Sequence, residues 1–279
     1  MSNERSSIMR QIVKKVMEGI GRAVFPVDIY CICCGSVIDS TRMYSLCDSC
    51  IVKFQWAGEG LCRKCGKLLG TNWTHDICYD CRTIRHYFDK GYTCCQYDLY
   101  ARAVVMDLKY RDKSYIGRII GDIMADRMES ELDNYDMPEK KYDLVIPVPV
   151  SKERMKERGY NQAGLIASRF AERMGIPYDE TVLIRSSKTV AMKDLNAMQR
   201  RLNIKGAFEV TERGKKLIRA ELKMGEYDKD GQAKSLMLID DIYTTGATLD
   251  ECARVLKEAG AERVDVLTFA AGRNYIPQK

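Results

Sequence analysis

Residues 235–249 read SLMLIDDIYTTGATL. The apolar residues 236–239 predict a buried strand, and two adjacent acids, Asp240 and Asp241, stand at its carboxyl end. A short turn of threonine and glycine follows, and a helix is predicted to begin at Thr248. Ligands of open α/β sheets bind at the carboxyl ends of strands, and free N–H groups at a helix N-terminus favour phosphate. The segment therefore predicts a site for a phosphorylated polyol such as ribose phosphate, although a plain strand end with a threonine N-cap gives the same pattern.

The chain around this segment alternates between strand and helix patterns from about residue 89 onward. Strands are predicted at 92–97, 143–148, 181–185, 236–239 and 264–269, and helices at 101–110, 115–131, 162–174 and 248–259. Such alternation predicts an α/β fold, with a mainly parallel sheet and helices on both of its faces. The charged segment 211–233 has weak periodicity and is predicted to be a mobile insertion.

Cysteine spacing defines a different module before the α/β region. Eleven of the 12 cysteines lie between residues 31 and 95, and eight of them form a C-x2-C, twelve-residue, C-x2-C pattern that repeats with an offset of 31. Two such turns bring four thiolates together around Zn²⁺, and four protein ligands make the site structural. Buried unligated cysteines and an iron–sulfur cluster remain alternatives, and the pairing of the ligands stays open. The candidate ligands are Cys31, Cys34, Cys47 and Cys50 in the first set and Cys62, Cys65, Cys78 and Cys81 in the second.

Composition and length limit the possible partners, the localisation and the number of domains. The 279 residues are 46% hydrophobic and 30% charged, with a net charge of +6 that permits contact with phosphates or nucleic acid without demanding it. No run approaches the roughly 18 apolar residues of a membrane span, and no signal-peptide core is present, so we predict a soluble cytoplasmic protein. We divide the chain into an amphipathic helix (1–28), a double zinc-binding module (29–88) and an α/β domain (89–279). The helix is expected to pack on its own protein, with docking to a partner or a membrane surface as the alternative.

The segment 236–248 resembles the binding signature of type I phosphoribosyltransferases for 5-phosphoribosyl-1-diphosphate (PRPP). The resemblance implies a phosphoribosyltransferase-like fold in which Asp240 and Asp241 hold the ribose hydroxyls. It further implies that the following turn cradles the 5′-phosphate through Thr244, Thr245, Gly246, Ala247 and Thr248.

Other segments are similar to those of the ComF family, competence-associated proteins that join a cysteine zinc module to a phosphoribosyltransferase domain. They are FP (25–26) ahead of CICCG (31–35), LKY (108–110), PVP (147–149), RGYNQ (158–162) and RRLNIKGAF (200–208). The resemblance implies binding of PRPP with Mg²⁺, and support of single-stranded DNA uptake during natural transformation alongside proteins of the DNA-uptake machinery. Trp56, Trp73 and Tyr79 are candidate aromatic contacts for the DNA.

The turn after the 143–148 strand is the expected pyrophosphate loop. Ser151 and Lys152 lie in it, Arg154 and Arg158 follow, and planar guanidinium groups suit phosphate. Mg²⁺ would bridge pyrophosphate and ribose oxygens. A solvated helical turn over 152–158 is the alternative. Further cations that could line the same cleft are Lys109, Arg111, Arg200 and Arg201.

Two other functions compete with the ComF-like one, and we assign no catalytic residue. The chain could be a metabolic phosphoribosyltransferase, a glycosyltransferase acting on an unidentified nucleobase or amine. By resemblance, enzymes that salvage 6-oxopurines carry an aspartate base where this chain has Thr244, which disfavours purine salvage. The chain could also be a zinc adaptor that senses PRPP without catalysis.

Overall fold

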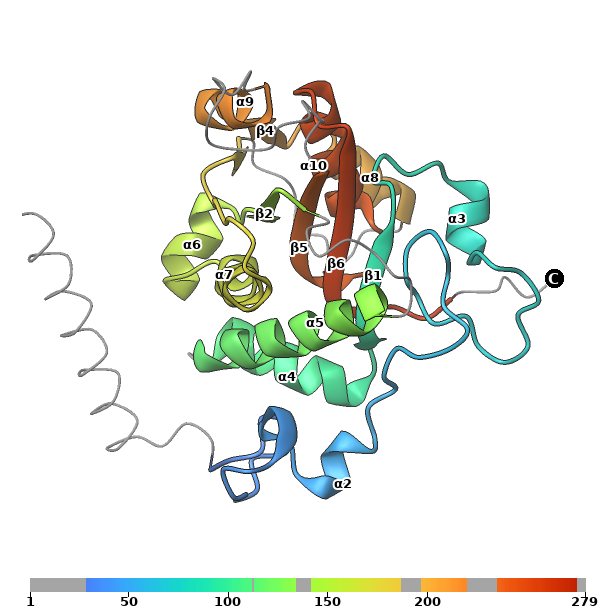
Figure 1. Ribbon diagram of the computed structural model, residues 1–279, viewed down its shortest axis with the longest axis vertical. Helices are drawn as coiled ribbons and strands as arrows, with labels where there is room; N and C mark the ends of the chain where they lie inside the picture. The colour runs from blue at the N-terminus through green and yellow to red at the C-terminus, as the bar shows by residue number, and fades with distance from the viewer. Residues whose placement is uncertain (1–28, 112, 134–141, 187–196, 220–234, 275–279) are drawn as a thin grey trace, which may run out of the picture. The chain divides into compact units, whose positions relative to one another are not determined.

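The computed structural model describes residues 29–111, 113–133, 142–186, 197–219 and 235–274 (Figure 1). The predicted amphipathic helix of residues 1–28 lies outside this part of the chain. The chain forms two compact units, residues 1–51 and residues 52–279. The described part of the first unit contains the 3₁₀ turn η1 (Met43–Ser45), the short helix α2 (Asp48–Ile51) and an antiparallel bridge between Tyr30 and Val37.

The second unit is built on a four-stranded sheet in which all neighbouring strands are parallel. Its order is β1 (Gly91–Gln96), β6 (Arg263–Ala271), β5 (Ser235–Tyr243) and β2 (Leu144–Pro147). In the register of β2 on β5, Pro147 lies opposite Ile239, and the Val148 N–H donates to the Ile239 carbonyl at 2.9 Å. The carboxyl ends of these two strands therefore lie side by side, which brings the loop after β2 next to the two acids of β5.

Helices cover both faces of this sheet. On one face, α5 (Tyr115–Asp133) and α7 (Gln162–Met174) pack against each other, and α7 packs on β2 and β5 (Figure 1). On the other face, Leu236 and Leu238 share a buried cluster with Leu249 of α10 (Ala247–Glu258). The alternating residues Met237 and Ile239 are also fully buried, as a strand covered on both sides requires. The remaining helices are α3 (Tyr79–Thr83), α4 (Leu99–Tyr110), α6 (Lys152–Arg158), α8 (Ala197–Ile204) and α9 (Glu212–Arg219).

A second, smaller sheet departs from the sequence expectation. The strand predicted at 181–185 is β3 (Leu183–Arg185), and it pairs antiparallel with β4 (Phe208–Val210) instead of joining the parallel sheet. The first part of segment 211–233, which was predicted to be a mobile insertion, instead forms α9 over residues 212–219 with Ile218 buried. Residues 220–234 of that predicted insertion lie outside the described residues.

The second cysteine set belongs to the same compact unit as the sheet. The Asp89 N–H donates to the Val264 carbonyl at 2.8 Å, and Trp56 forms an antiparallel bridge with Cys95 of β1. The boundary between the two compact units falls after residue 51, within the predicted 29–88 module. The division of the chain at residues 28 and 88 remains a prediction. Among the described residues, no helix is both long enough and apolar enough to cross a membrane.

Candidate functional site

A cleft of about 510 Å³ opens at the carboxyl ends of β2 and β5. Its volume lies in the usual range for small-molecule sites, roughly 300–1,000 Å³. The predicted residues that line it are Ser151, Arg154, Arg158, Asp240, Asp241, Thr244 and Thr248. The structure therefore brings the strand-end acids, the threonine turn and the loop after β2 to one place.

The two acids differ in their surroundings. Asp241 forms an ion pair with Lys109 of α4 at 2.7 Å, whereas the Asp240 carboxylate accepts a hydrogen bond from the Asp241 N–H at 2.8 Å. Burial, reinforced by the neighbouring charge of Asp241, raises the pKa of Asp240 to about 7. Burial alone would lower the pKa of Lys109, but the carboxylates of Asp241 and Asp240 raise it overall. The cleft floor is thus a compact cluster of one cation and two carboxylates.

The turn after β5 opens helix α10. Gly246 is its N-cap, with φ of 73°, a left-handed conformation that favours glycine. Thr244 and Thr248 line the cleft, whereas Ala247 is buried and the Thr245 carbonyl accepts from Arg201 at 3.4 Å. The first turn of a helix leaves N–H groups without partners in the helix, so this end of the cleft suits an anion.

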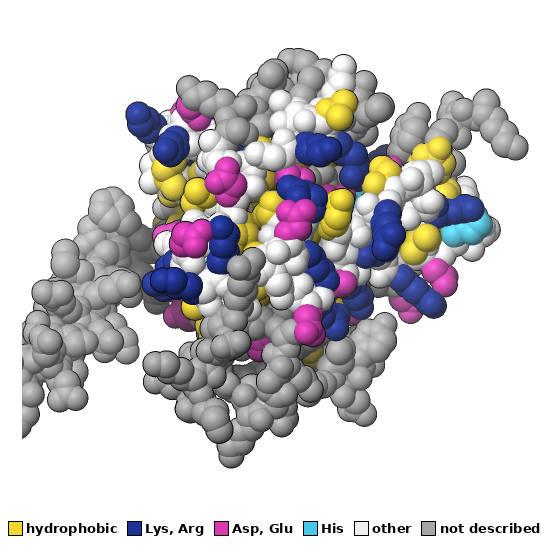
Figure 2. Space-filling model, turned by 90° about the horizontal axis from the view of Figure 1, so that it is seen from above, with side chains coloured by type: hydrophobic (Ala, Val, Ile, Leu, Met, Phe, Trp, Pro, Cys, Tyr) yellow, Lys and Arg dark blue, Asp and Glu magenta, His cyan; other side chains and the backbone are white. Residues whose placement is uncertain are grey.

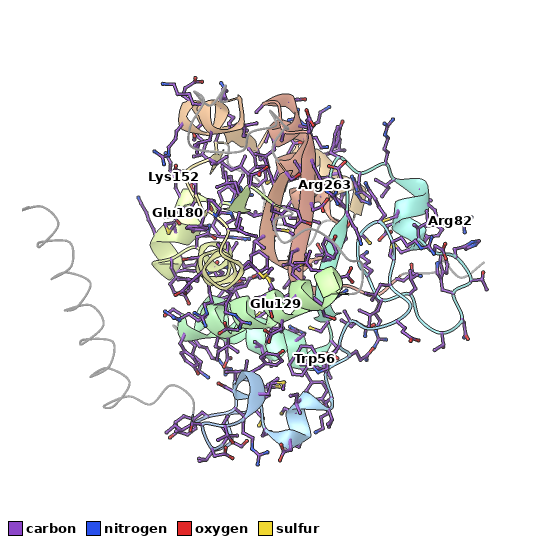
Figure 3. The ribbon with its side chains drawn as sticks, viewed as in Figure 1. Trp56, Arg82, Glu129, Lys152, Glu180 and Arg263 are labelled. Carbon is purple, nitrogen blue, oxygen red and sulfur yellow. The ribbon has the colours of Figure 1, made fainter. Side chains whose placement is uncertain are left out.

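The loop after β2 forms the opposite wall of the cleft. Ser151 caps α6, because its hydroxyl accepts from the Arg154 N–H at 3.3 Å. The Arg154 side chain is exposed and lines the cleft. Lys152 is exposed on α6 (Figure 3) and is not among the described residues that line the cleft. Residues 152–158 are helical, as the alternative interpretation of this segment anticipated.

Arg158 has a different environment from Arg154. It is 8% exposed, and its guanidinium donates to Gln162 Oε1 at 3.0 Å and to the Tyr110 hydroxyl at 3.1 Å. The guanidinium also lies 4.9 Å from the centroid of the Tyr110 ring. Arg158 therefore ties the end of α6 to α4 and α7, and it forms part of the cleft wall from a fixed position.

The last two residues of the RGYNQ segment had no role predicted from sequence. Asn161 and Gln162 line the cleft, and the Asn161 amide donates to the Val148 carbonyl at 3.1 Å. Their position close to the predicted pyrophosphate loop was the sequence signal that could have identified them. Of the four additional cations, Lys109 lines the cleft, Arg111 pairs with Asp107, Arg201 binds Asp250, and the side chain of Arg200 lies outside the described part.

Two groups of four cysteines are suited to metal. In each, the sulfur atoms lie within 4.8 Å of one another: Cys31, Cys34, Cys47 and Cys50 in one, and Cys62, Cys65, Cys78 and Cys81 in the other. The ligands therefore pair within each repeat, which settles the question that the spacing left open. Backbone N–H groups support the sulfurs, with Cys47 N–H on Cys31 at 3.4 Å and Cys78 N–H on Cys62 at 3.2 Å. Four thiols without an open position fit structural Zn²⁺.

These features define the class of protein: an α/β protein with a parallel sheet and a duplicated four-cysteine module. The family model that matches the chain is a double zinc ribbon domain, over residues 20–82.

Curated relatives extend the likeness across the sheet. Competence protein F of Haemophilus influenzae is 26% identical over 230 residues, or 81% of this chain and 90% of the relative. Competence protein ComFC of Streptococcus pneumoniae is 28% identical over 265 residues, or 87% and 99%. DNA utilization protein YhgH of Escherichia coli K12 is 29% identical over 124 residues, or 44% and 47%. The chain is thus a homologue of the ComF-type competence proteins, and the predicted resemblance is confirmed.

Two solved structures of phosphoribosyl enzymes are also similar. One is the glutamine PRPP amidotransferase from B. subtilis, at TM-score 0.32 and 17% identity, covering 56% of this chain and 26% of that chain. The other is a hypoxanthine phosphoribosyltransferase from Staphylococcus aureus, at TM-score 0.30 and 13% identity, covering 57% and 68%. Scores this low carry no argument about function.

Proposed function

We propose that the chain binds PRPP together with Mg²⁺ in the cleft and, as a ComF-like protein, supports the handling of single-stranded DNA in natural transformation. One observation carries the first part. The two acids of β5, together with Thr244 and Thr248 of the turn that follows, line the same cleft as the loop after β2. A phosphorylated ribose with a diphosphate needs this combination of diol acceptors and anion-binding turns.

The roles follow from the chemistry of each group. Asp240 and Asp241 hold the ribose hydroxyls, and the N-terminus of α10 takes the 5′-phosphate. Ser151 and Arg154 face the diphosphate, and Lys109 supplies positive charge beside the acids. Hard oxygen ligands near phosphates fit Mg²⁺, which binds through one or two carboxylates and substrate oxygens. The metal would supply neutralisation of the diphosphate charge.

Calorimetry with PRPP, with and without Mg²⁺, tests the proposal. The wild-type chain should bind PRPP only weakly without Mg²⁺, and the double variant Asp240→Asn/Asp241→Asn should lose binding. Glu258→Gln is the matched control, because Glu258 is an exposed acid that pairs with Arg254 and does not line the cleft. Absence of PRPP binding by the wild-type chain would exclude the proposed function.

The DNA-handling part is supported by the names of the relatives, competence protein and DNA utilization protein. On the face seen in Figure 2, Lys and Arg side chains are interspersed with acidic ones, so the net charge of +6 is not gathered there into one basic stripe. Two aromatic candidates have structural contacts: Trp56 stacks on Phe54 at 4.9 Å, and Trp73 donates to the Ile77 carbonyl at 2.9 Å. Tyr79 is 36% exposed.

Filter binding of labelled single-stranded DNA across a salt series tests this part. We expect salt-dependent affinity, because contacts with phosphate release counterions, and a loss of affinity in Tyr79→Ala. A wild-type chain without measurable affinity at low salt would remove direct DNA binding.

A phosphoribosyl transfer reaction is the second candidate. The observation that favours it is the Asp240 carboxyl in the cleft lining, where burial raises its pKa to about 7, a value suited to a general base. Release of pyrophosphate from PRPP in the presence of individual nucleobases and amines is the measurement, and silence across the panel would leave a binding role.

A further inference from the structure

The second cysteine group carries a buried cation. Lys67 is 2% exposed, and its Nζ pairs with the Asp80 carboxylate at 2.6 Å. Lys67 stands two residues after Cys65, and Asp80 stands between Cys78 and Cys81. The ion pair therefore links the two cysteine turns of the second zinc ribbon, which we define as residues 61–81.

The Lys67 ammonium group also lies close to β5, the strand that carries the two acids of the cleft. Lys67 Nζ lies 5.2 Å from the centroid of the Tyr243 ring. Tyr243 is 1% exposed, ends β5 and directly precedes Thr244, and Phe88 meets its ring edge-on at 6.2 Å. Cation–π contacts are strongest where water is excluded. The second zinc ribbon thus contacts Tyr243, the residue directly before the Thr244–Thr248 turn.

The turn folds back closely over this ring. A Cβ placed on Gly246 would lie 2.6 Å from Cζ of Tyr243. On its other side, the Tyr243 carbonyl accepts from the Gly272 N–H at 2.8 Å. Because the space between the ring and the turn is filled, a shift of the Tyr243 ring requires a shift of the turn.

A second connection reaches helix α10 from the segment after the ribbon. The buried carboxylate of Asp250, in the first turn of α10, accepts from His86 Nδ1 at 2.7 Å and from the Tyr87 N–H at 3.1 Å. Arg201 binds the same carboxylate at 3.0 Å and reaches the Thr245 carbonyl at 3.4 Å. The helix that opens the anion site is therefore fixed by residues next to the ribbon.

At the start of β1 the ribbon also contacts the sheet through backbone atoms alone. The Gly91 N–H donates to the Lys64 carbonyl at 2.7 Å. A Cβ on Gly66 would lie 2.7 Å from the Gly91 carbonyl oxygen, and one on Gly91 would lie 2.8 Å from Cα of Cys65. Two glycines thus allow the first cysteine turn to contact the start of β1 backbone to backbone.

We propose that Lys67 and Tyr243 are positioning residues through which zinc in the second ribbon sets the Thr244–Thr248 turn, so that zinc at this site and the phosphorylated ligand stabilise each other's binding. The inference rests on the proposed PRPP site. It assigns no such role to the first cysteine group, all of which lies in the other compact unit.

The repeat offset of 31 supplies a matched pair of variants, because Cys47 in the first group corresponds to Cys78 in the second. Zinc content and PRPP affinity in the presence of Mg²⁺ are measured for the full chain, Cys47→Ser and Cys78→Ser. We expect the wild-type chain to hold two zinc ions and Cys47→Ser to hold one with PRPP affinity within about twofold of wild type. Cys78→Ser should lose at least about tenfold in affinity, the size of a typical coupling between sites.

Since Cys78→Ser could also unfold, substitutions away from the ligands are needed. Lys67→Met should retain both zinc ions yet bind PRPP about tenfold more weakly. The exposed Lys216→Met is its control. Tyr243→Leu should weaken binding and Tyr243→Phe should restore it, because the Tyr243 hydroxyl has no hydrogen-bond partner among the described residues and the ring is what Lys67 faces.

Reciprocity gives a readout that does not depend on activity. If zinc strengthens PRPP binding, PRPP must raise the equilibrium affinity for one zinc ion, measured by competition with a chelator, in the wild-type chain but not in Lys67→Met. The inference alone would be overturned if the wild-type chain binds PRPP but Cys78→Ser and Lys67→Met bind it equally well. It would also be overturned if the wild-type chain binds PRPP and its zinc affinity does not change. A wild-type chain that does not bind PRPP would overturn the proposed function, and this inference with it.

Discussion

At the scale of single residues, Asp240 links the chemistry of the cleft to pH. Its pKa is raised from 3.8 to about 7, first by burial and then by Asp241. The folded chain thus favours protonated Asp240, so this residue's contribution to stability is present below about pH 4 and is lost as pH rises through about 7. Asp240→Asn should remove this fall, which thermal unfolding of the ligand-free chain between about pH 4 and about pH 7 measures.

Ligand affinity should depend on pH in the opposite sense. The ionised carboxylate is the form that accepts ribose hydroxyls or contacts Mg²⁺, so affinity for PRPP should rise as pH passes through about 7. Calorimetry at a series of pH values measures this dependence of PRPP affinity on pH. The control variant Glu258→Gln should show the same dependence as the wild-type chain. An affinity that is flat or falling across this range would contradict the assignment.

Arg154 and Arg158 provide a contrast between a proposed ligand contact and a structural contact. Arg154 is exposed on the cleft wall, whereas Arg158 is buried against Tyr110 and Gln162. Arg158→Lys should lower the free energy of unfolding by about 1–3 kcal/mol, because lysine cannot reproduce the planar contacts. Arg154→Lys should leave stability nearly unchanged and weaken PRPP binding. Denaturant unfolding and calorimetry of both variants separate the two roles, and equal stability of both variants would contradict them.

At the scale of elements, the turn between β5 and α10 is the most constrained. Gly246 has φ of 73°, and an added Cβ would meet the Tyr243 ring. Gly175, which caps α7 with φ of 63°, has no described atom within 4 Å of an added Cβ. Gly175→Ala should cost about 1 kcal/mol from backbone strain alone. Gly246→Ala should cost more by about 1–3 kcal/mol from overpacking, and it should weaken PRPP binding as well.

Chemical unfolding and calorimetry of these two glycine variants test the close contact. Equal destabilisation by the two substitutions would show that the turn can move away from the ring.

The sequence predicted those elements whose signals are local. Helix α7 matches its predicted bounds, and β5 with its acids and turn was found because an apolar run, two charges and a helix start lie in succession. The eight cysteines were found because metal ligands keep fixed spacing.

The remaining elements depend on contacts between distant residues. β3 pairs antiparallel with β4 because Leu183 meets Val210, a pairing that neither short strand indicates by itself. The two apolar residues of α9 carry too weak a pattern to predict a helix, although Ile218 is buried. The contact of Lys67 joins it to a tyrosine 176 positions later in the chain, which no local pattern shows.

At the scale of the whole molecule, the boundary between units has a direct consequence. Because the second ribbon shares a buried cluster with the sheet, a chain of residues 52–279 should fold and hold one zinc ion. A chain of residues 89–279, cut at the boundary expected from sequence, should lose the cover over Tyr243 and fail to fold cooperatively. Zinc content and thermal unfolding of both truncated chains are the measurements. A cooperatively folded 89–279 chain would show that the ribbon is dispensable for the core.

The two cysteine groups also differ in how readily outside reagents reach them. Each group has one half-buried cysteine, Cys47 and Cys81, but only the first has an exposed one, Cys34. Electrophiles and peroxide act on accessible thiolates, so alkylation followed by mass spectrometry should label the first group well before the second. Under oxidative stress the molecule would then lose one metal ion while the cleft beside β5 stays intact.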